Sequence, residues 1–438
     1  METPTGQDEV VDELRTWLEE NWDPDLSVGE WWQRLGLAGW AAPALPTNAY
    51  GRGLSRNDSV RVQSEIAEFG ALGAPGGLGL LLAAPTIADH GSQEQIDLYV
   101  RDIVTGAKAW CQLFSEPGAG SDLAGLTCRA ELDGDEWTIN GQKVWTSFGH
   151  VADLGMLIAR TDPELPKHQG ISWFAFDMHQ DGVEVRPLVE MTGHAMFNEV
   201  FLSDAKVRDE AIIGGRGKGW AVANSTLAHE RAGLGSGGGS AAAGTATPGT
   251  VAGQLDQRAG DFASGPKKKK KRSSGAAPIG GGGSKLLIDL AKGNGTIEDP
   301  SIRQDLMRLH TLGEIGRFNN LRLKAAKKAG QDIPGIGNIS KLAMSDIMRA
   351  TRDVGLRILG PAGMLHAYTD DQRGPNDDAT GNPFGQMVTS IALWAQGPPI
   401  YGGTDQIQRN IIGERVLGLP KEPGDTKNVP FSELPKNA

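Results

Sequence analysis

The nine residues Phe114-Ser115-Glu116-Pro117-Gly118-Ala119-Gly120-Ser121-Asp122 mark the change of character that decides the fold. They join a strand-like run to a glycine-rich loop. Glycines let backbone N–H groups approach a ligand closely, and the hydroxyl groups of Ser115 and Ser121 are further hydrogen-bond donors. A structural turn would account for the glycines but would not require the whole string. The string therefore indicates a ligand-binding loop at the start of a β domain.

The residues on either side of this loop differ in their periodicity. Residues 1–108 place apolar side chains at helical spacing, most clearly between Asp8 and Trp22. Residues 109–215 form short alternating runs separated by turn residues, which predicts a small β barrel or sandwich. Within them, Asn140-Gly141 between two such runs predicts a hairpin with a tight turn.

Residues 216–438 are predicted to be helical again, as a C-terminal bundle with one insert. Residues 233–285 are rich in Gly, Ser and Ala and contain the basic run Lys267–Arg272. Such a composition buries little apolar surface, so we expect a flexible insert with one short helix near residues 254–262. Residues 368–383 are polar and turn-rich. The predicted fold class is α+β, mainly α: a helical domain, a β domain and a helical bundle, without the strand–helix alternation of a doubly wound sheet.

Composition argues against several classes of function. The net charge of -11 argues against nucleic acid as a partner, and an anionic ligand such as CoA would need locally concentrated Lys or Arg. No secretory signal and no membrane-spanning run is visible, and the His and Cys residues lack metal-ligand spacing. With only Cys111 and Cys128 there is no disulfide framework, so a reducing cytoplasm is the expected location.

A second glycine-rich string, residues 214–219, fails both nucleotide-loop patterns. It reads Gly-Gly-Arg-Gly-Lys-Gly, with glycine where a phosphate-binding loop needs Ser or Thr after the lysine. We therefore expect a surface turn that precedes a helix.

The loop at residues 114–122 resembles the signature of the acyl-CoA dehydrogenase family. Two later strings resemble further family segments: Ile139-Asn140-Gly141-Gln142-Lys143-Val144-Trp145-Thr146-Ser147, and Ile400-Tyr401-Gly402-Gly403-Thr404-Asp405-Gln406-Ile407-Gln408-Arg409 with Gly413–Gly418 after it. The likeness covers the chain except residues 233–285 and roughly 367–394. It implies the fold expected above, with a C-terminal four-helix bundle.

The resemblance also implies a cofactor and residues that hold it. The cofactor is FAD. Family positions for FAD binding correspond to Gln112, Phe114, Ser115, Ser121, Trp145, Thr146, Ser147, Gly360, Thr404 and Gln406. Trp145, Thr146 and Ser147 would contact the isoalloxazine ring, with Trp145 beside it. Ser121 and Arg231 would be substrate-binding residues.

Two departures from the family pattern concern contacts across subunits. The family's Arg-x-x-Phe-Gly segment, which reaches the FAD pyrophosphate of a neighbouring subunit, is missing where the insert stands. The family's Gly-Gly-x-Gly turn is only partly present, as Gly360-Pro361-Ala362-Gly363. The resemblance implies a homo- or hetero-oligomer, a dimer or tetramer, but leaves open whether FAD contacts from a neighbour are retained.

The resemblance implies that the general base is a Glu at the second of two positions found in the family. Many members carry a Glu where this chain has Gly402, which cannot accept a proton. A smaller set carries the Glu on the first helix of the C-terminal domain, and Glu230 falls on that position. The alternative is a surface carboxylate on a helix. Members with this second base act on branched, long or bulky acyl chains, which suggests a steroid side chain or a long-chain acyl-CoA, as in actinobacterial catabolism.

The expected activity is FAD-dependent α,β-dehydrogenation of an acyl-CoA thioester in fatty-acid, lipid or steroid metabolism. Glu230 would remove the Cα proton, the flavin would take the Cβ hydride, and electrons would pass to an electron-transfer flavoprotein. Three alternatives stay open: a non-catalytic subunit of a heteromeric enzyme, an oxidase of the same fold, and a nucleic-acid-binding branch. Only Lys267–Arg272 favours the last, and it lacks the interleaved aromatics that stack bases.

Overall fold

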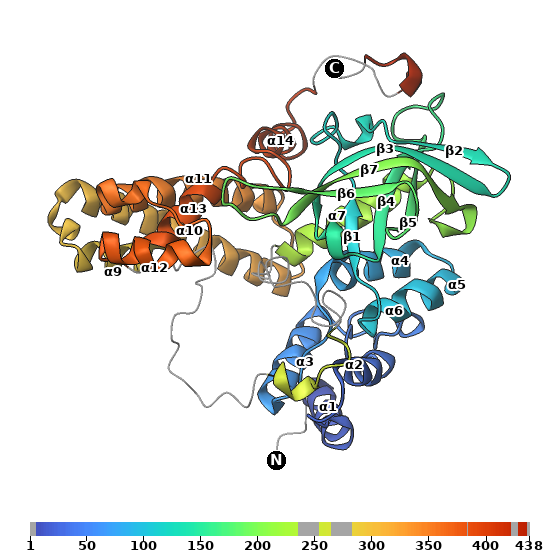
Figure 1. Ribbon diagram of the computed structural model, residues 1–438, viewed down its shortest axis with the longest axis horizontal. Helices are drawn as coiled ribbons and strands as arrows, with labels where there is room; N and C mark the ends of the chain where they lie inside the picture. Colours follow the sequence, from blue (N-terminus) through green and yellow to red (C-terminus); the bar gives the residue numbers. More distant parts are fainter. Residues whose placement is uncertain (1–5, 235–253, 264–282, 383, 422–427, 436–438) are drawn as a thin grey trace. The chain divides into compact units, whose positions relative to one another are not determined.

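The computed structural model describes residues 6–234, 254–263, 283–382, 384–421 and 428–435 (Figure 1). The basic run Lys267–Arg272 lies outside these residues. The chain divides into two compact units, which are described separately: residues 1–188, 196–273 and 425–438 form the first, and residues 189–195 and 274–424 form the second. The two units do not coincide with the three predicted domains, whose boundaries remain a prediction.

The first unit begins with helices around a tryptophan-rich core. At the start of α2 (Val28–Leu37), Ser27 and Glu30 form a capping box, in which the side chain of each residue accepts from the backbone amide of the other. Trp31 and Trp32 are buried, and their indole N–H groups donate to the carbonyl oxygens of residues 72 and 73. The helices are α1 (Gly6–Asn21), α2 (Val28–Leu37), α3 (Arg56–Phe69), α4 (Ala84–His90), α5 (Gln93–Gln95) and α6 (Arg101–Val104), with π-helical turns η2 (Gly79–Ala83) and η3 (Ile96–Val100).

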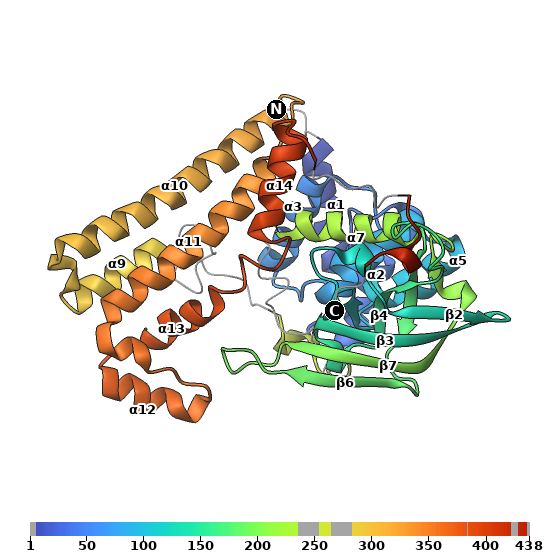
Figure 2. The ribbon, with the colours of Figure 1, turned by 90° about the horizontal axis from the view of Figure 1, so that it is seen from above.

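An eight-stranded sheet follows in the same unit, confirming the predicted middle β domain. The strands are β1 (Trp110–Leu113), β2 (Arg129–Asp133), β3 (Glu136–Ser147), β4 (Leu154–Arg160), β5 (Ile171–Asp177), β6 (Val183–Leu188), β7 (Phe197–Arg208) and β8 (Ile212–Ile213). Their order is β6-β7-β3-β2-β4-β5-β8, and β1 pairs with β4 in parallel. Figure 2 shows β3 and β7 running side by side as the two longest strands.

The predicted hairpin at Asn140-Gly141 is wrong. β3 runs unbroken through these residues, and the tight turn lies at Gly134-Asp135, where Asp133 pairs with Glu136. Gly134 has a φ of +63°, the left-handed conformation that such a turn needs. Gly141 serves packing instead, since a Cβ there would lie 2.8 Å from the Cα of Cys128.

Strands β4 and β5 are buried on both faces, and alternate residues enter two different cores. Met156 and Trp173 pack with the helices in the first core, whereas Leu157 and Phe174 pack in a second core inside the sheet domain. Because side chains alternate across a strand, both strands read as continuous apolar runs. One sheet therefore joins the helical layer to the β core.

Helix α7 (Gly219–Leu234) completes the first unit. It packs against α4, β5 and η2. Trp220 and Leu227 lie against the first core, and Val222 and Ala223 belong to it. The first helix after the sheet is thus part of this compact unit.

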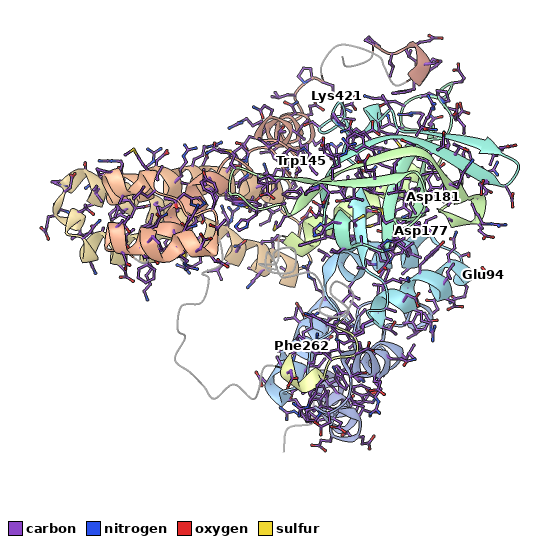
Figure 3. All side chains as sticks on the ribbon, in the orientation of Figure 1. Glu94, Trp145, Asp177, Asp181, Phe262 and Lys421 are labelled. Carbon is purple, nitrogen blue, oxygen red and sulfur yellow. The ribbon has the colours of Figure 1, made fainter. Side chains whose placement is uncertain are left out.

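Residues 254–263 lie against the N-terminal helices, and they contain one short helix within the stretch where a short helix is predicted. This helix is a 3-10 helix, η7 (Ala259–Asp261), and turns and bends make up most of the remaining residues. The amides of Val28 and Gly29 donate to the carbonyl oxygens of residues 257 and 255, at 2.8 and 2.9 Å. Figure 3 shows Phe262 beside the N-terminal helices, where it packs on their core. These hydrogen bonds stabilise the position of residues 254–263, because the first N–H groups of α2 have no partner within their own helix.

The second unit is a helical bundle, as predicted. Its helices are α9 (Gly283–Gly293), α10 (Pro300–Lys328), α11 (Ile336–Leu359), α12 (Asp370–Thr380), α13 (Gly385–Trp394) and α14 (Asp405–Ile411). Residues of α9, α10, α11 and α13 share one core. α12 occupies the stretch predicted to be turn-rich, with Pro375 inside it. None of the described helices is long and apolar enough to cross a membrane.

Candidate active site

The loop after β1 is held at its base and open at its tip. Phe114 is buried and Ser115 is half-buried, whereas Ser121 is exposed. A Cβ added at Gly118 or Gly120 would meet nothing within 4 Å, so protein packing does not require either glycine. Gln112 is half-buried on β1, at the register position opposite the 156 position of β4. The loop thus presents hydroxyl groups and free space at the surface.

The base of the loop is an ion pair of two buried side chains. Lys143 on β3 is fully buried, and its Nζ donates to Glu116 Oε1 at 2.8 Å and to the carbonyl oxygen of Phe114 at 3.1 Å. Burial alone would raise the pKa of Glu116, but the Lys143 charge and hydrogen bonds from residues 127 and 128 outweigh burial and lower that pKa. The backbone amide of Val144 also donates to the carbonyl oxygen of Ser115. The loop is therefore bonded to β3 directly before Trp145.

Trp145 is an exposed aromatic residue in an unusual backbone conformation. Its φ is +62°, and 56% of its surface is exposed. It stands where the β3–β7 register shifts between Lys143 and Thr146. Its indole meets the Phe197 ring edge-on, with 5.7 Å between centroids. Figure 3 shows Trp145 near the end of β3.

The two residues after Trp145 face opposite ways. Thr146 is fully buried, and its carbonyl oxygen accepts a hydrogen bond of 3.0 Å from the side-chain amide of Asn198. Its side chain is therefore not a surface contact, although it was predicted to touch a flavin ring. Ser147 is half-buried. The side chains that this segment offers to a ligand are those of Trp145 and Ser147.

Helix α7 carries Glu230 and is fixed along α4 by three polar pairs. The Thr86 hydroxyl donates to the Thr226 hydroxyl at 3.1 Å within the core. His90 bonds Ser225 at 2.7 Å, and His229 lies 3.0 Å from Asp89. Glu230 is half-buried and follows buried Thr226 by one turn on the same helix face. The Arg231 side chain lies outside the described part of the structure.

The C-terminal string forms a capped turn in the second unit. Thr404 caps α14 by accepting from the amide of Ile407 at 3.1 Å, and Gln406 is exposed. Gly402 has a φ of +63° and open space around it, so any side chain there would strain the backbone. Gly360 ends α11 with a φ of +56°. Thr404, Gln406 and Gly360 thus all lie at helix ends.

Sequence reasoning missed the residues that hold these segments. Asp405 and Gln408 are buried and bind α11 and the 402–403 carbonyl groups, and Asn198 binds the backbone after Trp145. Lys143 could have been found, since alternation along β3 puts it on the same buried face as Trp137 and Ile139.

The residues of the first unit fit a flavin. An exposed, backbone-constrained indole, half-buried hydroxyl groups and a loop whose glycines leave open space suit a flat heteroaromatic ring with hydrogen-bonding edges. Among the described residues no cluster of His, Cys, Asp and Glu could hold a metal ion. Burial raises the pKa of the two free thiols, Cys111 to about 12 and Cys128 to about 11, which makes neither a nucleophile near neutral pH.

Sequence models of the acyl-CoA dehydrogenase family match three parts of the chain. The N-terminal domain matches residues 5–107, the middle domain residues 111–205 and the C-terminal domain residues 288–417. Among solved structures, the Tcur3481-Tcur3483 steroid ACAD is 24% identical with a TM-score of 0.65, covering 96% of this chain and 99% of that one. The ChsE4-ChsE5 complex from Mycobacterium tuberculosis has a TM-score of 0.63 at 24% identity, covering 96% of this chain and 100% of that one. These likenesses show the fold.

Curated relatives match 90% and 94% of the chain. Acyl-CoA dehydrogenase IpdE1 of Mycobacterium tuberculosis is 34% identical over 394 residues, 90% of this chain and 88% of the relative. The protein of the same name from Mycolicibacterium smegmatis is 32% identical over 437 residues, 94% of this chain and 97% of the relative. Family membership implies a flavin cofactor. The chain belongs to the acyl-CoA dehydrogenase family of oxidoreductases.

Proposed function

We propose that this chain catalyses FAD-dependent α,β-dehydrogenation of an acyl-CoA thioester, with Glu230 as the general base. The observation that carries the proposal is the fixation of α7 by three polar pairs, directly before a half-buried Glu230. The family's commoner base position holds Gly402, whose left-handed backbone disfavours any side chain. Glu230 is then the carboxylate that the chain offers for this step.

The base must act on a weakly acidic hydrogen. A thioester α-proton leaves only when the developing enolate is stabilised and the base is held in reach. The polar pairs with α4 hold the α7 backbone, so Glu230 loses little freedom when the substrate binds.

The flavin, when bound, supplies the acceptor for the hydride that leaves Cβ. Trp145 and Ser147 would lie along the ring, and Ser115 and Ser121 would supply hydroxyl groups from the loop. Ser121 and Arg231 are proposed to bind the substrate. Thr404, Gln406 and Gly360 are proposed to hold the remainder of FAD. Thr146 would contribute only its backbone, because its side chain is fully buried.

We further propose a bulky acyl group and an electron-transfer flavoprotein as the acceptor. Support for bulk comes from the base position on α7 and from the solved neighbour named a steroid ACAD. The enzyme is expected in the cytoplasm as a dimer or tetramer.

A panel of acyl-CoA thioesters of increasing bulk, mixed anaerobically with the yellow protein, tests the proposal. Bleaching of the flavin absorbance by a long-chain or steroid side-chain thioester supports it. A protein that takes up no FAD, or whose bound FAD is bleached by no thioester, contradicts it. Admitting oxygen after bleaching distinguishes a dehydrogenase, which stays bleached until an electron-transfer flavoprotein is added, from an oxidase.

A non-catalytic subunit is the second candidate function. The missing Arg-x-x-Phe-Gly segment favours it, since part of an FAD site would then come from elsewhere. A solved neighbour is itself described as a complex of two differently named chains. Co-expression with a homologue encoded beside this gene tests this: flavin that binds and bleaches only in the co-purified complex supports the second candidate.

A further inference from the structure

Lys143 and Glu116 form a charged pair that is buried directly behind the ligand loop. The Lys143 side chain is fully buried and that of Glu116 is 4% exposed. Lysine is rarely buried to this extent, because removing its charge from water is costly. Replacing such a pair by apolar residues often leaves stability unchanged or improves it. A pair kept at this place therefore calls for a role other than stability.

The hydrogen bonds of the pair connect three segments of the chain. The Glu116 carboxylate accepts from the Thr127 amide at 2.7 Å, the Thr127 hydroxyl at 2.9 Å and the Cys128 amide at 2.9 Å. Lys143 adds its bonds to Glu116 and to the Phe114 carbonyl oxygen. The start of the ligand loop, the residues that lead into β2 and the middle of β3 are thus bonded to one centre.

Trp145 lies two residues after this centre, in a conformation that it would not adopt alone. A positive φ is strongly disfavoured for a bulky residue and persists only where its surroundings enforce it. On one side, Lys143 and Val144 are bonded to the loop. On the other side, the side-chain amide of Asn198 donates to the Thr146 carbonyl oxygen. Trp145 is therefore held between two buried sets of hydrogen bonds, with its indole exposed.

We propose that Glu116 and Lys143 are positioning residues that hold Trp145 in its left-handed conformation and so present the indole to the bound flavin. The pair acts through Trp145 and does not itself touch flavin or substrate. The second half of this inference rests on the proposed function, whereas the first half concerns the protein alone. The two halves can be tested separately.

The first test needs neither flavin nor substrate. The chain is labelled with 5-fluorotryptophan, and the Trp145 resonance is identified by its loss in Trp145→Phe. We expect one sharp resonance in the parent and a shifted or broadened one in the Lys143→Met/Glu116→Gln double variant, while the other tryptophan resonances stay in place. A Trp145 resonance of unchanged position and width in the double variant overturns the proposal. If the methionine variant does not fold, Lys143→Gln/Glu116→Gln keeps polar groups without charge and replaces it.

The second test asks whether the pair acts through Trp145. Residues that act as one unit give non-additive effects. The double variant should lower the rate of flavin reduction at least about tenfold with KM changed less than about threefold, and Trp145→Ala should do the same. Adding Trp145→Ala to the double variant should then lower the rate by no more than about twofold further. Additive losses in the triple variant overturn the proposal.

An exposed pair between β3 and β7 is the matched control. Lys206 Nζ lies 3.7 Å from Glu136 on β3, and about half of each side chain is exposed. Lys206→Met/Glu136→Gln should leave both the Trp145 resonance and the rate of flavin reduction unchanged. If the parent binds no flavin and the Lys143→Met/Glu116→Gln variant still shifts the Trp145 resonance, the positioning role is supported and the proposed function is refuted.

Discussion

Replacing Asp405 by Asn tests the buried charge cluster that joins α14 to α11. Asp405 is 4% exposed, and the Ser345 hydroxyl donates to its Oδ1 at 2.7 Å. Arg349 donates twice to its Oδ2, at 3.2 and 3.1 Å, and Lys341 Nζ lies 3.4 Å from its Oδ1. The substitution keeps the side-chain shape but leaves two cations without their shared carboxylate.

The expected magnitude follows from the burial of each partner. Removing one partner of a buried pair costs about 3–5 kcal/mol. The Arg349 side chain is 34% exposed, so water can solvate it once the carboxylate is lost. The cost of losing its part of the pair is therefore closer to that of a surface ion pair, ~1 kcal/mol or less. We expect Asp405→Asn to lower the free energy of unfolding of the second unit by about 2 kcal/mol, or its melting temperature by about 4–8 °C.

The same cluster makes a prediction about pH. Burial alone would raise the pKa of Asp405, but hydrogen bonds from Ser345 and Arg349 and the charge of Lys341 outweigh burial and lower that pKa. A carboxylate whose pKa is lowered by folding stabilises the folded state. This stabilisation is complete above the unfolded pKa of about 3.9 and is lost as the pH falls through the folded pKa. The difference between parent and variant should therefore be full at pH 7 and should shrink in acid below the unfolded pKa.

Thermal unfolding followed by circular dichroism, at neutral and acid pH, measures both effects. The matched control is Asp346→Asn, which removes an exposed carboxylate that bonds the same Arg349 at 2.7 Å. We expect little change in that control. Equal melting temperatures for the Asp405 variant and the parent at pH 7 would refute the reasoning.

Three further predictions concern the first unit. Gly141→Ala places a Cβ 2.8 Å from the Cα of Cys128, so urea unfolding should show a loss of about 1–3 kcal/mol, and an unchanged midpoint would count against this packing. Gly260→Val places a Cβ 2.8 Å from Pro24, so limited proteolysis should cut residues 254–263 faster than in the parent; equal rates would show that the position of these residues does not depend on this contact. Cys111 and Cys128 should resist thiol reagents at pH 8 in the native state and both react after unfolding, because their raised pKa values leave almost no thiolate and their side chains are buried; rapid native labelling would contradict this.

The order of helical and β regions was predictable because periodicity reports which faces are buried. Alternation along β3 and the helical spacing near the N-terminus each reflect one buried face. The family strings located the ligand loop and Trp145 but carried no information on conformation. That Thr146 points inward depends on the register shift between β3 and β7, which involves residues some 50 positions away.

The features that sequence reasoning missed came from residues whose role is set by distant neighbours. Asn140-Gly141 has the composition of a hairpin turn, yet Gly141 is small because β2 passes close to it. Residues 254–263 lie in a stretch of low-complexity composition, yet their backbone meets the free amides at the start of α2. Neither the approach of β2 to Gly141 nor the contact of residues 254–263 with α2 can be predicted from the local sequence.

The measurement that tests the central claim most directly is the rate of anaerobic flavin reduction in Glu230→Gln. With a thioester that bleaches the parent, we predict that the variant keeps its FAD and its fold but reduces at least about 10²-fold more slowly, the lower end for loss of a general base. The control is Glu68→Gln, which changes an exposed glutamate on α3 and should match the parent. A Glu230→Gln variant that reduces its flavin as fast as the parent would contradict the assignment of the base and the mechanism built on it.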